Sequence, residues 1–177
     1  TPLYSSAASD VYKRQDLNIR PALGFHRQAE LERVERLNQI SHIIKASDAD
    51  IEWLYGLAPG SDIDSIASEW SKQKLVVVTR GSEGVSLYQD GTKVDAAGLK
   101  VNLVDTVGAG DTFMASFLSE LGALAALGDN PQERIKNLTS DQLIEVAKIS
   151  NAAAAIVCER TGCQPPTKQE IRQRIQG

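Results

Sequence analysis

Residues 104–113 read Val-Asp-Thr-Val-Gly-Ala-Gly-Asp-Thr-Phe, and a strongly apolar stretch follows them. The small turn Gly108-Ala109-Gly110 places main-chain N–H groups at the start of that stretch, where they can bind an anion such as phosphate. The apolar side chains after the turn recur at helical spacing, which predicts a helix over residues 111–127: Phe113, Phe117, Leu121 and Leu124.

Asp111 is the first acid after this turn. A carboxylate beside an anion site suits a general base that takes a proton from a hydroxyl while a phosphoryl group is transferred to it. The alternative is an ordinary helix start, in which Asp111 interacts only with the helix dipole. The preceding Asp105-Thr106 and the apolar helix that follows favour the first interpretation.

A second candidate site lies in residues 79–84, Thr-Arg-Gly-Ser-Glu-Gly, at the end of the β-branched run 75–79. Such a run is typical of a strand buried in a parallel sheet, and ligands bind outside the carboxyl ends of these strands. We therefore expect a nucleotide loop there: Thr79, Arg80, Gly81, Ser82 and Gly84. The alternative is a simple turn into a hairpin over 84–95. No GxGxxG motif opens a helix after a strand and no Walker A motif occurs, so a Rossmann dehydrogenase is disfavoured.

Three other polar segments have two interpretations each. Ser47-Asp48-Ala49-Asp50 follows the expected strand 42–46 and can hold Mg²⁺, but taken alone it is better explained as the capped start of a helix over 47–55. Arg20 can pair with phosphate or lie on the surface before Pro21. Asn151 lies in an Ala-rich helix that allows close approach of a ligand, and it can equally be a capping or exposed amide.

The order of predicted elements is strand, helix, strand, helix, strand, hairpin and three helices, which indicates an α/β domain with a mostly parallel sheet. Capping boxes at Thr139–Gln142 and Thr167–Glu170 begin the last two helices. Residues 1–15 show no helical or strand periodicity and lack the apolar core of a signal peptide, so we expect an extraneous or disordered tail before a domain at 16–177.

Composition excludes several classes of function. The net charge of -4 provides no basic surface for nucleic acid, and no apolar run is long enough to cross a bilayer. Cys158 and Cys163 fit neither a disulfide framework nor a zinc site, so we expect two reduced thiols and a cytoplasmic location.

Five segments together resemble the ribokinase-like sugar kinases of the phosphofructokinase-B type. They are DLNIRP (16–21), KASDADIEWL (45–54), VVVTRGSEGVSLY (76–88), VDTVGAGDTFMASFL (104–118) and NAAAAIVCERTGCQPP (151–166). The DTVGAGDTF motif is highly specific to that family, and among its members the first and fourth segments are most similar to bacterial fructokinases. The resemblance covers nearly all of 16–177 and implies a three-layer α/β/α domain that uses ATP, Mg²⁺ and, in some members, K⁺.

The resemblance also implies roles for individual residues. Asp111 matches the catalytic base, and the backbone of Gly108, Ala109 and Gly110 matches the anion hole. Residues 79–84 match the nucleotide loop, Asn151 flanks the adenine, and Arg20 and Ser47 lie near the nucleotide. Asp50 falls at the Mg²⁺-associated acid, where many members have Asn-x-x-Glu instead of Ser47-x-x-Asp50. The residues at the monovalent-cation site of some members are Asp105, Val107, Val157, Arg160 and Gly162.

This family phosphorylates sugar hydroxyls, and fructose is the substrate that the resemblance favours. Ribose, 2-keto-3-deoxygluconate or another small sugar is the alternative, as is a non-catalytic nucleotide-binding protein on the same fold. The family's amino-terminal half and its β-lid, which carry most sugar contacts and often a dimer interface, are not visible in this sequence. We therefore expect the chain alone to have little or no kinase activity.

Overall fold

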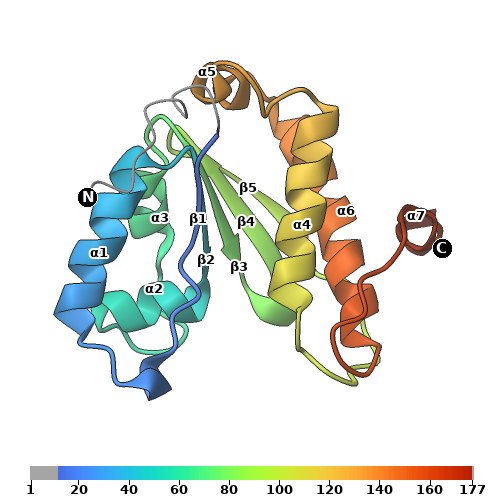
Figure 1. Cartoon of the computed structure of the whole chain (residues 1–177), viewed down its shortest axis with the longest axis horizontal. Helices are drawn as coiled ribbons and strands as arrows, with labels where there is room; N and C mark the ends of the chain where they lie inside the picture. Colours follow the sequence, from blue (N-terminus) through green and yellow to red (C-terminus); the bar gives the residue numbers. More distant parts are fainter. Residues whose placement is uncertain (1–11, 177) are drawn as a thin grey trace, which may run out of the picture.

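A five-stranded sheet organises the chain in the computed structural model, which describes residues 12–176 (Figure 1). Its strands lie in the order β1-β2-β3-β4-β5. Their bounds are β1 Arg14–Asp16, β2 Ile43–Ser47, β3 Leu75–Thr79, β4 Gly84–Gln89 and β5 Thr92–Ala97. The first three run parallel, and the predicted hairpin adds β4 and β5 antiparallel at one edge.

Helices cover both faces of this sheet, which confirms the α/β/α layering (Figure 1). Three lie on one face: α1 Arg27–Ile40, α2 Asp48–Tyr55 and α3 Asp64–Trp70. On the other face lie α4 Ala109–Ala123 and α6 Ser140–Cys158, while α5 Pro131–Lys136 lies near the end of α4 and α7 Lys168–Gln176 packs outside α6.

Alternating strand residues supply two separate cores, as expected for a sheet covered on both faces. Val77 and Leu87 face α4 and α6, where they join Phe113 and Phe117. Val76 and Val78 point the other way and join the residues of α1 to α3. These strand residues are fully or almost fully buried, which explains why 75–79 reads as a continuous apolar run rather than as an alternating one.

Two predicted boundaries were wrong, and one helix was missed. The chain enters the sheet at Arg14, inside the segment assigned to a tail, and Gln15 is buried; a three-residue strand is too short for periodicity to detect. The helix predicted at 111–127 is α4, which begins earlier, at Ala109, and ends at Ala123, because Ala125 takes a left-handed conformation with φ 54°. The helix α5, with Pro131 in its first turn, was not predicted at all.

Candidate active site

A cavity of about 460 Å³ lies beyond the carboxyl end of β3, between the start of α4 and the middle of α6. It brings together predicted residues from three distant segments: Thr79, Gly81, Ser82, Gly84, Ala109, Gly110 and Asn151. The remaining lining is largely apolar and includes Leu99, Val101, Leu103 and Phe113. A planar, mostly apolar ligand group fits such a lining.

The start of α4 forms one end of this cavity. Gly108 is the N-cap residue with φ 80°, a conformation that L side chains rarely adopt. A Cβ at Gly108 would also lie 2.1 Å from the Sγ atom of Cys163, so only glycine fits. The first N–H groups of a helix have no acceptor within it. Ala109 N donates to Thr106 O at 3.2 Å, which leaves the N–H groups of Gly110 and Asp111 for an anion.

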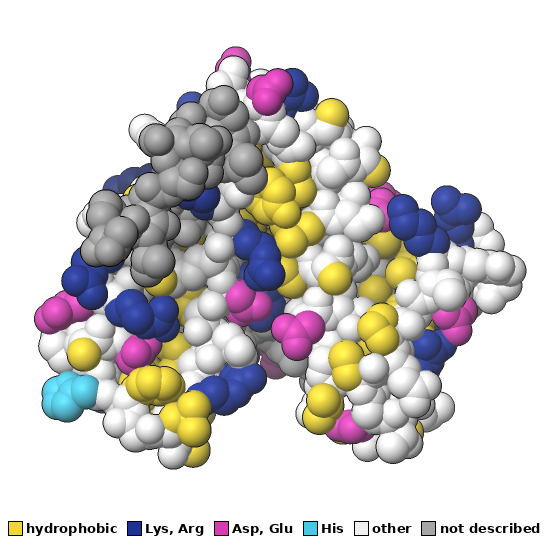
Figure 2. All heavy atoms as spheres, viewed as in Figure 1, with side chains coloured by type: hydrophobic (Ala, Val, Ile, Leu, Met, Phe, Trp, Pro, Cys, Tyr) yellow, Lys and Arg dark blue, Asp and Glu magenta, His cyan; other side chains and the backbone are white. Residues whose placement is uncertain are grey.

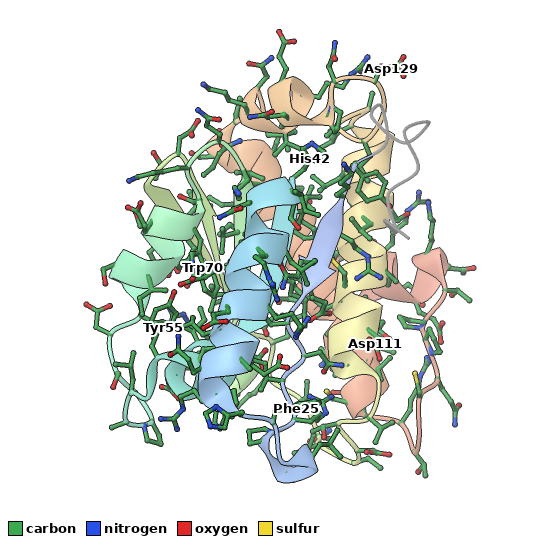
Figure 3. The ribbon with its side chains drawn as sticks, turned by 60° about the vertical axis from the view of Figure 1, so that its left-hand side comes forward. Phe25, His42, Tyr55, Trp70, Asp111 and Asp129 are labelled. Atoms are coloured by element: carbon green, nitrogen blue, oxygen red, sulfur yellow. The ribbon has the colours of Figure 1, made fainter. Side chains whose placement is uncertain are left out.

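Asp111 lies in the first turn of α4 and is exposed (Figure 3). Its side chain lines a second hollow of about 330 Å³, which also includes Ser116 and Cys163. This hollow adjoins the cavity, because Asp111 lines the hollow and its neighbour Gly110 lines the cavity. The carboxylate is thus not turned into the interior, and it is open to a substrate hydroxyl that approaches the end of the cavity.

Lys45 is a site residue that sequence reasoning missed. It lies in β2, is only 7% exposed, and its Nζ atom donates to Asp16 Oδ1 at 3.0 Å. The same Nζ atom lies 3.6 Å from the point where a Cβ on Gly110 would stand. A buried ammonium group, paired with Asp16, therefore lies beside the first turn of α4.

The signal for this lysine is visible in the sequence. Lys45 interrupts the apolar run Ile43-Ile44-Lys45-Ala46, where a charged residue is costly unless it has a partner. Its partner Asp16 is far away in the sequence, so the pair could not be predicted.

Figure 2 shows acidic and basic side chains gathered at the notch between the two helical layers.

The predicted nucleotide loop is closed by its own backbone. Arg80 N donates to Gly84 O at 2.8 Å, and Glu83 N donates to Arg80 O at 3.0 Å. The Arg80 side chain does not reach the cavity: its Nη2 atom donates to Asp64 Oδ1 at 2.8 Å and to Tyr88 OH at 3.0 Å. The side chain of Arg80 therefore does not line the predicted cofactor site, which corrects the prediction for this residue. Asp64 and Tyr88 hold the side chain on the α3 side of the sheet.

Asn151 lines the cavity, but its amide group has another use. Its Nδ2 atom donates to the carbonyl oxygens of Ala96 at 3.2 Å and Ala97 at 3.0 Å. The side chain thus fixes the end of β5 against α6. Its amide hydrogens are thus already paired, and a place for Asn151 beside the adenine stays a prediction.

The carboxylate of Asp50, where the resemblance places Mg²⁺, is engaged by two main-chain N–H groups, and Mg²⁺ binding there stays a prediction. Its Oδ1 atom accepts from Ile19 N at 2.9 Å and its Oδ2 atom from Ser47 N at 2.8 Å, and the residue is 7% exposed. Ser47 Oγ in turn accepts from Asp50 N, which completes a capping box at the start of α2. Ser47 and Asp50 thus form the capped start of a helix, which was the alternative interpretation of this segment. Among residues 12–176 no group of three His, Cys, Asp or Glu side chains is placed to hold a metal ion.

We expect Asp50→Ala to lower the free energy of unfolding by about 2 kcal/mol, because half of the capping box is lost and the buried Ile19 N–H group loses its acceptor. Urea unfolding followed by circular dichroism measures this change. Asp48→Asn, in the same turn of α2, is the control and should change stability little. An Asp50 variant of unchanged stability would contradict the structural role.

Arg20 lies outside the cavity lining. It is exposed, and its Nη1 atom donates to Ile19 O at 3.2 Å. It follows β1 at the carboxyl end of the parallel strands, so its position remains compatible with a phosphate that approaches from solvent. Its role stays a prediction.

Four of the five predicted cation-site residues lie in two loops, and the fifth, Val157, lies in the last turn of α6. Asp105 Oδ1 accepts from Val107 N, and Asp105 Oδ2 accepts from Gly162 N, both at 3.0 Å. These two N–H groups hold the pKa of the Asp105 carboxyl below its usual value. The Val157 carbonyl accepts from Arg160 N at 3.0 Å as α6 ends. The structure thus joins the two loops, while cation binding there stays a prediction.

Comparison with known proteins identifies the family. A model of the pfkB family of carbohydrate kinases matches residues 4–170. The chain belongs to this family. Fructokinase from Rhizobium leguminosarum bv. trifolii is 43% identical over 108 residues, which cover 60% of this chain and 32% of the relative. Fructokinase-1 from Zea mays is 30% identical over 168 residues, which cover 91% of this chain and 48% of the relative.

Solved structures confirm the ribokinase-like fold. Aminoimidazole riboside kinase from Salmonella enterica, complexed with aminoimidazole riboside and an ATP analogue, has a TM-score of 0.73 at 19% identity and matches 94% of this chain and 52% of its own. Fructokinase from Vibrio cholerae O395, bound to fructose, ADP and calcium, has a TM-score of 0.72 at 20% identity and matches 92% and 50%. The pfkB chain described here therefore spans about half the length of these structures, and a third to a half of the two relatives above.

No helix within residues 12–176 of this pfkB chain is both long and apolar enough to span a membrane.

Proposed function

We propose that this chain is the nucleotide-binding part of an ATP-dependent sugar kinase that converts fructose to fructose 6-phosphate. The observation that supports this most is the arrangement around the start of α4. A mostly apolar cavity, main-chain N–H groups, a buried lysine and an exposed carboxylate meet there in that order. These are the parts that transfer of a phosphoryl group to a hydroxyl requires.

Each part has a defined task in this proposal. The cavity between residues 79–84 and α6 holds the base and ribose of ATP, and the start of α4 with Lys45 attracts the phosphate groups. Asp111 takes the proton from the sugar hydroxyl. The oxygen of that hydroxyl attacks the terminal phosphorus of ATP, and ADP leaves. Main-chain N–H groups then stabilise the charge on the transferred group.

Fructose is proposed because the relatives named fructokinase share residues throughout the matched region. Ribose or another small sugar is the alternative, since the Salmonella structure was solved with a riboside. The hollow of about 330 Å³ beside Asp111 is large enough for either sugar, so the residues of this chain do not discriminate between them.

Two measurements test the proposal. The purified 177-residue chain should bind ATP, measured by displacement of a fluorescent ATP analogue. Turnover is measured by coupled ADP release across fructose, ribose and 2-keto-3-deoxygluconate, in a chimera that joins this chain to the amino-terminal half of the Rhizobium fructokinase. Fructose should give the highest kcat/KM. If the chain binds ATP but the chimera phosphorylates none of these sugars, the result would favour a non-catalytic nucleotide-binding protein.

A further inference from the structure

Arg80 connects the predicted nucleotide loop to a cluster of polar side chains on the far face of the sheet. The cluster consists of Asp64, Arg80, Ser86, Tyr88, Lys93 and Asp95. Tyr88 belongs to the core under α1 to α3, whereas the cavity is lined by Phe113 of the opposite core. The cluster and the cavity therefore lie on different faces, and the loop joins them at the end of β3.

Asp64 is the common acceptor of this cluster. Its Oδ1 atom accepts from Arg80 Nη2 at 2.8 Å and from Tyr88 OH at 2.6 Å, and its Oδ2 atom accepts from Lys93 Nζ at 2.8 Å. Burial by itself would raise the pKa of this carboxyl, but the bonds from Lys93 and Tyr88 and the charges of Lys93 and Arg80 outweigh burial and lower it. Asp64 is thus a charged anchor under ordinary conditions.

Arg80 is held at two points, which restrains its backbone as well as its side chain. Besides the bond to Asp64, its Nε atom donates to Ser86 Oγ at 2.9 Å, and Ser86 Oγ donates to Asp95 Oδ1 at 2.6 Å. A guanidinium group bound through separate nitrogen atoms has a fixed orientation. Because Arg80 N and Arg80 O both close the loop onto Gly84 and Glu83, this orientation fixes the loop.

The loop has little room to take another shape. A Cβ on Gly84, whose φ is 109°, would lie 2.2 Å from Ala96 O, and Gly98 N donates to Glu83 O at 3.0 Å. The loop therefore lies flat against the end of β5, with Gly81 and Ser82 facing the cavity. A restraint on one side of this loop is transmitted to its other side.

We propose that Asp64 is a positioning residue that acts through Arg80 to hold the 80–84 loop in its nucleotide-binding shape and so sets the affinity for the nucleotide. Asp64 does not line the cavity, and neither the sequence pattern nor the family resemblance singled it out. The affinity part of this inference rests on the proposed function, whereas the restraint on the loop does not.

The test uses Asp64→Ala in the full 177-residue chain and two readouts. Without nucleotide, amide hydrogen exchange at Arg80 and Glu83 should become at least tenfold faster, because both N–H groups close the loop. The affinity for ATP, measured by displacement of a fluorescent analogue, should fall about tenfold. Glu69→Gln is the matched control: it removes an exposed acid from the same helix, where it pairs only with Lys72, and should change neither readout.

A double-mutant cycle separates positioning from a general loss of stability. If Asp64 acts through Arg80, adding Asp64→Ala to Arg80→Ala should change exchange and ATP affinity by less than twofold. Additive effects would overturn the inference, as would unchanged exchange in the single Asp64 variant. Asp64→Asn, which keeps the size of the side chain, should show the same direction with a smaller effect and serves if the Ala variant unfolds.

The two proposals fail in different ways. A wild-type chain that binds no ATP contradicts the proposed function and the affinity part of this inference, while hydrogen exchange still decides whether Asp64 restrains the loop. A wild-type chain that binds ATP, together with an Asp64 variant of equal affinity and faster exchange, contradicts only the link between Asp64 and affinity.

Discussion

Asp111→Asn is expected to reduce sugar phosphorylation by about 10²–10⁴-fold in kcat while ATP affinity stays within twofold of the wild-type value. An amide has the shape of the carboxylate but cannot accept the proton of the attacking hydroxyl. The residue is exposed and lies in the hollow beside the cavity, so neither the fold nor the nucleotide cavity should change. Coupled ADP release by the chimera with the Rhizobium fructokinase measures kcat, and displacement of a fluorescent ATP analogue measures affinity.

Asp129→Asn is the control for this experiment. Asp129 is also exposed, but it lies beyond the other end of α4 (Figure 3). Its variant should keep full turnover. If the Asp111 variant retained turnover near the wild-type rate, another group would have to accept the proton, and the proposed role of Asp111 would be wrong.

Lys45→Met is expected to have the second large effect, on stability and on ATP affinity together. The substitution removes one partner of a largely buried ion pair and leaves the Asp16 carboxylate without its counter-charge. Such a loss typically costs about 3–5 kcal/mol, and the partial exposure of Asp16 favours the lower end of this range. Chemical unfolding of the 177-residue chain measures this cost.

The double variant Asp16→Asn/Lys45→Met separates the two effects. With both charges removed, most of the lost stability should return, because no uncompensated charge remains buried. ATP affinity should stay about 10–100-fold below the wild-type value, since a hydrogen bond from a charged group contributes about 1.5–3 kcal/mol. Adenosine affinity should be unchanged, because adenosine carries no phosphate. Wild-type ATP affinity in the double variant would exclude Lys45 from the phosphate site.

Local chemistry made several elements predictable from sequence. The run 75–79 forms β3 with the predicted bounds, because its β-branched apolar residues fit a strand buried on both faces. The boxes at Ser47 and Thr139 cap α2 and α6, and Gly56 ends α2 with φ 66°. At these helix ends the decisive contacts lie within four residues, so the sequence window contains them.

Elements whose signal was weak or distant were missed. The strand β1 has three residues and gains its bonds from β2, and α5 has six residues, too few to show a period. Asp50 was assigned to a metal only through the family resemblance, and the sequence could not show that Ile19 N would reach its carboxylate from 31 residues away. Arg80 was placed at the cofactor because the sequence could not show its partners either, since Asp64 and Tyr88 take its side chain only in the folded chain.

The motif around Gly108 and Asp111 was the most specific sign of the family, and it predicted the start of α4 to within two residues of Ala109. A helix N-terminus depends mainly on neighbouring residues, so the sequence could indicate it. Tertiary structure decided which groups meet: it brought Lys45 beside Gly110, gave the Asp50 carboxylate the N–H group of Ile19 and turned Arg80 toward Asp64. These outcomes follow from the cost of burying an unpaired charge, which each side chain avoids by finding a partner far away in the sequence.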